Sequence, residues 1–225
     1  MDRRYAGATA LGLSAVALPV QLVVALQWPE GYSITANAIS DLGVTTCGQF
    51  DEGGTQLRSV CSPWHGLFNM SMVLSGVLTA LGAALLHRWW PGRSGRAGTS
   101  LLVIAGVLLA VVGLAPWDTH PDLHDRAALG QAVVQWLAMG LLAAAAGVGA
   151  FRRITIAALG LSVAGFVTFV AALEGTDVPI VGFGGAERLS FDTLTLWTAG
   201  AGGLLLARKR APRLKDELPI GAPHA

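Results

Sequence analysis

Hydrophobic residues in this chain are grouped into long stretches that contain no formally charged residue. A membrane-spanning helix needs roughly 20 mostly apolar residues, and backbone groups left unpaired in lipid are so costly that helices are the usual solution. The alternation of apolar and polar residues typical of a barrel strand is absent. The pattern predicts an all-α polytopic membrane protein, a bundle of six transmembrane helices, with spans at about 7–27, 64–87, 100–116, 124–150, 154–173 and 190–207.

The six spans leave little of the chain over. We expect residues 1–210 to form one membrane domain, and residues 211–225, which contain three prolines and charges of both signs, to form a disordered cytoplasmic tail. The last span is short and rich in threonine, and it can extend back to Leu189.

The basic residues give the orientation of the bundle. Twelve of the 15 lysines and arginines fall on one side of the predicted spans, and only Arg58, Arg126 and Arg188 fall on the other. Because basic residues collect on the cytoplasmic side, both termini are predicted to be cytoplasmic. The loops that carry Asp41, His120, His124 and Arg188 are then extracytoplasmic, on a protein of the cell membrane.

Composition supports this class and excludes others. The chain is 53% hydrophobic and 13% charged, whereas soluble domains have about 45–50% apolar and about 25% charged residues. A soluble enzyme and a nucleic-acid-binding protein are therefore excluded, and membrane lipid is the expected partner. The sequence defines no protein partner.

Both cysteines, Cys47 and Cys61, lie in the first predicted outer loop. An extracytoplasmic compartment permits a disulfide, so we predict that the pair closes a loop of about 15 residues, which is worth on the order of 3 kcal/mol. A redox pair or a set of metal thiolates is the alternative.

The same loop contains the segment Asn37-Ala-Ile-Ser-Asp-Leu-Gly43, in which Asp41 has no basic neighbour. A buried carboxylate must be paired or protonated, and the candidate partners are the outer arginines and histidines. In the alternative interpretation, Ser40 or Asp41 caps the start of a short helix.

Three of the five histidines lie on the outer side. His120 and His124 are four residues apart at the expected start of the fourth span, which puts them on one helix face, and His65 opens the second span. Such imidazoles can hold a divalent metal such as zinc, with Asp41 or Asp118 as a further ligand. This spacing also arises on solvated helix starts, in which case no cofactor is implied.

Helical spacing extends the outer site into the membrane. His124, Gln131 and Gln135 share one face of the fourth helix, and His65 and Asn69 share one face of the second. Polar groups at membrane depth usually face the bundle interior or a wet cavity. We therefore expect a polar pocket between these two helices that is open to the outside, or hydrogen bonds between helices worth about 0.6–2 kcal/mol each.

The third outer loop, at about 174–191, contains Gly182-Phe-Gly-Gly-Ala-Glu-Arg188. Glycines give a flexible approach to the last helix. Arg188 is interpreted as a clamp for an anionic lipid headgroup, because guanidinium binds phosphate through two hydrogen bonds. In the alternative it reaches the lipid boundary or pairs with Glu187.

These motifs together resemble a known family. They are the segment 37–43, Pro63-Trp-His-Gly-Leu-Phe-Asn69 at the second span, His124-Asp-Arg-Ala-Ala128 and Gly185-Ala-Glu-Arg188. Over about residues 8–208 the chain resembles the bacterial and archaeal membrane family catalogued as domain of unknown function 998. It is more distantly similar to the eukaryotic DRAM and FGF-receptor-activating-protein group.

The resemblance implies lipid handling more than a defined reaction. The first family has no settled activity, and the eukaryotic group is linked to lipid remodelling and membrane organisation. Carried over by position, the signature residues are Ser40, Asp41, Gly43, His65, Asn69, His124 and Arg188.

Three functions remain open at this point. The first is binding of a lipid headgroup or small amphiphile by residues Ser40, Asp41, His65, Asn69, His124, Gln131 and Arg188. The second is a hydrolase or transferase that acts on a lipid, with or without a metal, and has Asp41, His65 and His124 as catalytic candidates. The third is a transporter or scaffold subunit.

Overall fold

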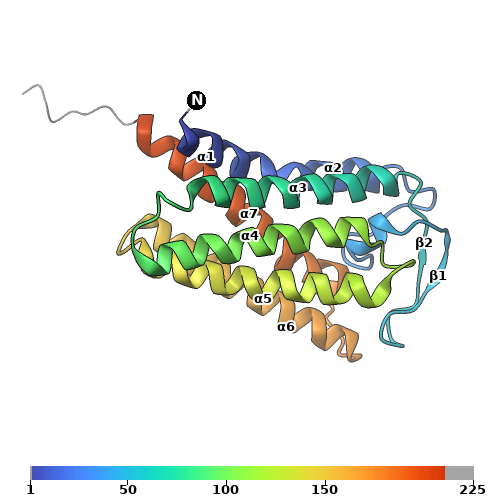
Figure 1. The fold of residues 1–225 in the computed structure, drawn as a ribbon. Helices are drawn as coiled ribbons and strands as arrows, with labels where there is room; N and C mark the ends of the chain where they lie inside the picture. The colour runs from blue at the N-terminus through green and yellow to red at the C-terminus, as the bar shows by residue number, and fades with distance from the viewer. Residues whose placement is uncertain (1, 211–225) are drawn as a thin grey trace, which may run out of the picture.

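The computed structural model describes residues 2–210, and the predicted tail at 211–225 lies outside the described residues. Long helices run side by side along most of the molecule, and a small two-stranded hairpin covers one end (Figure 1). The elements in chain order are α1 (Arg3–Leu13), a 3-10 turn (Ser14–Val16), α2 (Ala17–Ala25), a second 3-10 turn (Ser40–Gly43), β1 (Gly48–Phe50), β2 (Arg58–Val60), α3 (His65–Leu86), α4 (Gly92–Leu114), α5 (Pro121–Ala145), α6 (Ala150–Leu173) and α7 (Gly182–Arg210).

Five of these helical segments are long and apolar enough to cross a membrane: Arg3–Ala25, His65–Leu86, Gly92–Leu114, Pro121–Ala145 and Ala150–Leu173. Each overlaps one of the first five predicted spans. The predicted sixth span falls within α7, which is not one of these five helices over its described residues. The helical class predicted from the sequence is therefore confirmed, with five membrane-competent helices and α7 as a further long helix.

The first span is interrupted rather than continuous. A 3-10 turn at Ser14–Val16 separates α1 from α2, and Pro19 lies in the first turn of α2. A proline inside a helix lacks the N–H for one hydrogen bond, and its ring clashes with the carbonyl four residues earlier, here that of Ala15. The tighter turn at Ser14–Val16 accommodates this clash.

The hairpin defines what we call the hairpin end of the bundle. Strands β1 and β2 are antiparallel, with Gly48 opposite Val60 and Phe50 opposite Arg58. The disulfide between Cys47 and Cys61 closes the hairpin, which confirms the predicted pairing.

The opposite end is called the basic end, because the chain reversals there carry Arg88, Arg93, Arg96, Arg152 and Arg153. No acidic residue lies between Arg88 and Arg96 or beside Arg152 and Arg153. The predicted sorting of charge along the chain therefore corresponds to the two ends of the bundle.

Small residues bring the helices close together. A Cβ added to Gly106 of α4 would lie 2.6 Å from the backbone nitrogen of Ala80 in α3, and one added to Gly202 of α7 would lie 2.5 Å from the carbonyl oxygen of Ala8 in α1. Close backbone approach at small residues is the usual basis of helix packing in membranes.

Helix α7 begins at Gly182, eight residues before the predicted start at residue 190. The glycines that were expected to form a flexible loop are instead the first turn of this helix. Gly182 has a φ of +69°, and a Cβ at Gly184 would overlap the carbonyl oxygen of Asn37. Close packing against the first loop therefore explains the glycines better than flexibility does.

Candidate functional site

Asp41 forms a buried ion pair at the hairpin end. Its side chain is fully buried, and both carboxylate oxygens accept hydrogen bonds from Arg58, at 2.7 Å from Nε and 2.7 Å from Nη2. Arg58 Nη2 also donates to Glu52 at 2.8 Å, and its Nη1 donates to the carbonyl of Gln56. Of the partners considered from the sequence, the structure places Arg58 against Asp41.

The Asp41 carboxylate also organises the backbone that precedes it. Its Oδ2 accepts hydrogen bonds from the backbone nitrogen of Ala38 at 2.9 Å and from the side chain of Asn37 at 3.4 Å. The short helical turn at 40–43 has no side-chain cap. With its acceptors occupied by the chain itself, Asp41 holds the first loop in place and leaves no free oxygen for a ligand.

Burial changes the acidity of this cluster. Burial by itself lowers the pKa of the Arg58 guanidinium, but its bonds to Asp41 and Glu52 raise the pKa by more, so the net shift is upward. Burial raises the pKa of Glu52 above its ordinary value, although Arg58 opposes the shift. The arginine therefore stays charged over the physiological pH range.

Arg188 is committed to the backbone of the first loop. Its Nη1 donates to the carbonyls of Ile34, Asn37 and Gly184 at 3.1, 2.9 and 2.9 Å, and its Nη2 donates to the hydroxyl of Tyr32. It lines a surface hollow between α2, the first loop and α7, which shares the lining residues Gln21 and Asp192 with the cavity described below but has none in common with the lateral groove described after it. The guanidinium fixes the loop on the start of α7.

His65 and Asn69 also hold the loop. Nδ1 of His65 lies 2.9 Å from the carbonyl oxygen of Ser62, and Nδ2 of Asn69 donates to the carbonyl of Gly43 at 2.9 Å. A Cβ on Gly43 would overlap the Asn69 amide oxygen. This contact explains why a glycine ends the segment 37–43.

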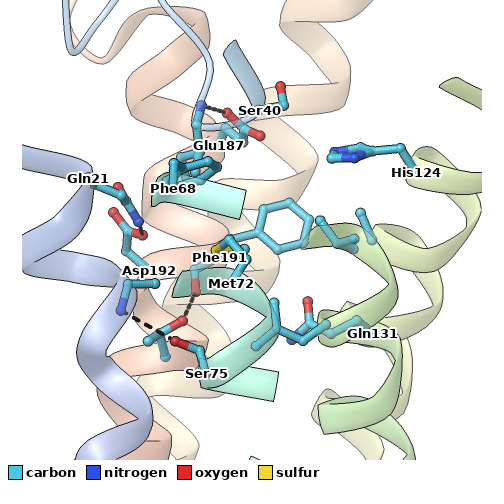
Figure 2. A pocket seen from close by; sticks show the side chains of 16 residues that line it. Gln21, Ser40, Phe68, Met72, Ser75, His124, Gln131, Glu187, Phe191 and Asp192 are labelled. Carbon is cyan, nitrogen blue, oxygen red and sulfur yellow. Dashed lines mark hydrogen bonds between the residues drawn. The ribbon is translucent and has the colours of Figure 1, made fainter. Parts of the chain in front are cut away.

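A small cavity inside the bundle, which we call the inner chamber, lies below this loop. It has a volume of about 60 Å³, which is enough for a few water molecules at about 10–15 Å³ each. It lies between α2, α3, α4, α5, α7 and the first loop, and Figure 2 shows its lining. Its polar lining residues are Gln21, Ser40, Ser75, His124, Gln131, Glu187, Asp192 and Thr195.

The chamber offers hydrogen-bond acceptors. Nδ1 of His124 lies 2.8 Å from the carbonyl oxygen of Ala115, so the neutral ring donates there and Nε2 remains an acceptor. Glu187 accepts a hydrogen bond from the backbone nitrogen of Ile39 through Oε2, and among residues 2–210 no donor bonds its other oxygen. In Figure 2 the His124 ring extends from α5 toward the side of the chamber where Glu187 and Ser40 lie.

Deeper polar residues form a chain of hydrogen bonds. Gln131 donates to Gln135 at 2.6 Å, and Gln135 donates to Thr198 of α7 at 2.9 Å. Gln21 of α2 donates to Asp192 of α7 at 2.9 Å. The bonds from Gln135 and Gln21 join helices, which the sequence offered as one alternative for Gln131 and Gln135.

A larger hollow, the lateral groove, opens beside the chamber between α5, α6, α7 and the first loop. Its volume is about 540 Å³, within the range of roughly 300–1,000 Å³ found for ligand pockets. Apolar side chains form most of its wall on α5 and α6, and in Figure 1 the two helices diverge toward the hairpin end. The groove and the chamber have five lining residues in common: Ser40, His124, Ala128, Glu187 and Phe191.

Burial controls the charge of Glu187, which lies in α7 before the predicted span of residues 190–207. Its side chain is 8% exposed. Burial raises the pKa of its carboxyl to about 8, and the opposing effect of Arg188 is smaller. This carboxyl can therefore gain or lose a proton near neutral pH.

The metal set considered from the sequence does not assemble. Within residues 2–210 no group of three or more histidine, cysteine, aspartate or glutamate side chains lies close enough to hold a metal ion. His65, His120 and His124 bond to Ser62, Thr119 and Ala115 through their Nδ1 atoms. These residues do not fit a metal centre.

Of the seven ligand-binding residues predicted from the sequence, the structure brings Ser40, His124 and Gln131 together in the chamber. Asp41, His65, Asn69 and Arg188 do not line it. Sequence reasoning treated Glu187 only as a partner for Arg188, and it did not consider Gln21 or Asp192. A signal was present, because Gln21 and Asp192 are polar residues within apolar segments, where such groups normally face the interior.

The fold and site define a helical protein with several membrane-competent helices and a polar interior hollow. The family model described as "Protein of unknown function (DUF998)" matches residues 12–203, and the chain belongs to this family. No curated protein matches the chain. No solved structure matches it.

Proposed function

We propose that the protein binds a membrane amphiphile whose apolar tail lies in the lateral groove and whose amine or hydroxyl group reaches the inner chamber. The observation that carries this proposal is that the groove and the chamber are lined in part by the same five residues. A molecule in the groove therefore lies next to the polar groups of the chamber.

The walls of the groove fit a tail that arrives from the bilayer. Leu129 of α5 and Phe166, Phe169 and Val170 of α6 supply apolar surface. Burial of such surface contributes about 25 cal/mol for each Å² removed from water, but a tail that leaves lipid gains little of this. Affinity then depends on the polar end of the ligand.

The charges of the lining favour a hydrogen-bond donor at that end. Among the described residues, neither hollow has a lysine or arginine in its lining, whereas Glu52, Asp125, Glu174 and Glu187 line the groove. A phosphate would lose its hydration without gaining a cation, which is costly. An ammonium or hydroxyl group instead donates to Glu187 and His124, and bonds to an ionised partner are the strong ones.

Size sets a further limit. A chamber of about 60 Å³ takes a terminal amine or hydroxyl group and its water, but not a whole sugar or phosphodiester. This differs from the anion clamp expected at Arg188, because the guanidinium there already donates to three carbonyls and a hydroxyl.

Native mass spectrometry of the purified protein with dodecylamine, dodecanol and dodecyl phosphate tests this function. The wild-type protein is expected to retain the amine best and the phosphate least. Ala128→Phe, which fills the point where groove and chamber meet, is expected to lower amine binding at least tenfold. Ala144→Phe, at an exposed position on the same helix α5, serves as the matched control, and equal binding by both variants would contradict the proposal.

A second candidate is a hydrolase or transferase that acts on such an amphiphile. The observation that favours it is that Ser40 and His124 line both hollows, and the Ser40 hydroxyl makes no hydrogen bond to another described residue. A hydroxyl and an imidazole acceptor that line the same cavity are the components of a nucleophile and base pair. Release of fatty acid or amine by wild type but not by Ser40→Ala or His124→Gln would support this reading, and its absence from wild type would contradict it.

A further inference from the structure

A large hollow with a charged rim lies at the basic end, far along the bundle from the chamber. It has a volume of about 750 Å³ and lies between the start of α1, the end of α3 and the third and fourth turns of α4. We call it the basic groove. Its charged rim is formed by Asp2, Arg3, Arg4 and Arg88.

Two of the three arginines have no partner among the side chains that the structure describes. The guanidinium groups of Arg3 and Arg88 form no hydrogen bond or ion pair with another residue of the range 2–207. The Arg4 guanidinium lies 3.8 Å above the ring of Trp89, and this stacking leaves the edges of the guanidinium, which carry its N–H groups, open to a ligand.

Asp2, the acidic residue that the described part of the chain contributes to the rim, is already engaged. Asp2 caps α1, and its Oδ1 accepts a hydrogen bond from the backbone nitrogen of Arg4 at 3.0 Å. Among the described residues, three arginines against one aspartate leave two excess positive charges on the rim. His87 Nδ1 lies 3.0 Å from the Thr99 hydroxyl, and that hydroxyl also lies within bonding distance of the Gly95 and Arg96 carbonyls. Because a hydroxyl has a single hydrogen, His87 donates to Thr99, and Nε2 is its free atom.

The floor of the groove is apolar. Leu85 of α3 and Val103 and Ile104 of α4 line it below the charged rim, and the side chain of Ile104 is 47% exposed. Trp89, which is 41% exposed, stands at the level of the arginines, where amphipathic aromatic rings mark the boundary between membrane and water. A groove with cations at the boundary and apolar surface beneath matches the shape of a phospholipid.

From this arrangement we propose that the basic groove is a binding site for an anionic phospholipid, with the phosphate held by Arg3, Arg4 and Arg88 and an acyl chain along Leu85, Val103 and Ile104. Basic pockets between helices bind acidic headgroups in this way. The site is independent of the amphiphile proposed for the lateral groove, because the two hollows share no residue and differ in charge.

Thermal unfolding of the purified full-length protein in dodecyl maltoside tests the proposal, with phosphatidylglycerol, phosphatidylcholine or inorganic phosphate as the added probe. Phosphatidylglycerol is expected to raise the melting temperature of the wild type, and phosphatidylcholine to raise it much less. Inorganic phosphate at the same concentration is expected to have no effect, because it lacks the chain that the floor binds. Stabilisation by inorganic phosphate equal to that by phosphatidylglycerol would show a free-phosphate site and overturn the lipid assignment.

The variants separate this groove from general surface charge. Arg3→Gln combined with Arg88→Gln is expected to lower the affinity for phosphatidylglycerol. The lipid concentration that gives half of the maximal rise in melting temperature should increase by about 25-fold, or about fivefold for each arginine removed. The control, Arg152→Gln combined with Arg153→Gln, removes two exposed arginines at the same end of the bundle but outside the groove, and is expected to respond as the wild type does. Equal responses of the two double variants would overturn the proposal.

If the double variant unfolds without lipid, Arg88→Gln alone is compared with Arg152→Gln by native mass spectrometry. A bound phosphatidylglycerol lost only from Arg88→Gln supports the proposal. Retention of the lipid by Arg88→Gln at the wild-type level overturns it.

Discussion

At the scale of single residues, the polar groups at the hairpin end divide into two kinds. Asp41, Asn69 and Arg188 bond to other parts of the protein and hold the first loop on the bundle. Glu187 and His124 each keep an acceptor free beside a hollow. A motif residue can therefore be structural while a less conspicuous neighbour carries the chemistry.

The buried pair of Asp41 and Arg58 is expected to dominate the stability of the first loop. Asp41→Asn keeps the shape of the side chain but leaves the buried guanidinium without its main partner, and removal of one member of a buried pair costs about 3–5 kcal/mol. Chemical unfolding in detergent measures the loss, with Glu30→Gln at an exposed position of the same loop as control.

A double variant separates the energy of the ion pair from the cost of leaving one of its charges buried alone. Asp41→Leu combined with Arg58→Met is expected to be more stable than the two single losses added together, because neither the Asp41 carboxylate nor the Arg58 guanidinium is left buried without the other. Additive losses would contradict the role assigned to the pair.

Glu187 is expected to make stability depend on pH. Its pKa is raised to about 8 in the folded protein, against about 4.3 in an unfolded chain, so the folded state binds the proton more tightly. The stabilisation that protonated Glu187 gives the folded state is therefore fully present below about pH 4 and is lost as the pH rises toward 8. The free energy of unfolding falls by a few kcal/mol at most over this range.

Glu187→Gln is the matched test of this dependence, because it keeps an acceptor for the Ile39 N–H and removes the ionisable group. Melting temperatures in detergent from pH 5 to pH 8.5 are expected to fall for wild type and to stay nearly level for the variant. Parallel curves would show that another group is responsible.

At the scale of elements, the apolar pattern was sufficient to predict five of the long helices and insufficient for their ends. The extended apolar stretches determine where a helix can cross a bilayer, but caps and local packing determine where it begins. Pro19 breaks the first span into α1 and α2 within one stretch that carries no charged residue from Tyr5 to Pro29. Helix α7 begins at Gly182 because its glycines pack on the first loop, and that loop is distant in sequence.

Gly184 provides a test of this packing. Gly184→Ala places a Cβ on the Asn37 carbonyl, so the start of α7 or the loop must move, and we expect a loss of about 1–3 kcal/mol. Gly203→Ala, on the same helix with open space at its Cβ position, is expected to be neutral or stabilising by up to about 1 kcal/mol. Equal unfolding midpoints for the two variants would contradict the close contact.

At the scale of the whole molecule, the two ends of the bundle present opposite chemistry. The hairpin end has hollows lined by acids and acceptors, and the basic end has a groove rimmed by arginines. The sorting of charge and the disulfide could be predicted from the sequence, because each follows from residue type and position along the chain. The set of residues that line the chamber could not be predicted from the sequence. It depends on which turn of α7 faces α5, and on how the first loop is held by the arginine that reaches Asp41.

The central claim is that a membrane amphiphile enters between α5 and α6 with its polar end toward Glu187 and His124. Photocrosslinking with a long-chain alkylamine that carries a diazirine in its tail, performed on the protein in bilayers and mapped by peptide mass spectrometry, tests it most directly. The account predicts labelling concentrated on Leu129, Phe166 and Phe169, and its loss in Ala128→Phe. Labelling spread evenly over outward-facing residues such as Ile156 and Val163 of α6, unchanged in that variant, would contradict it.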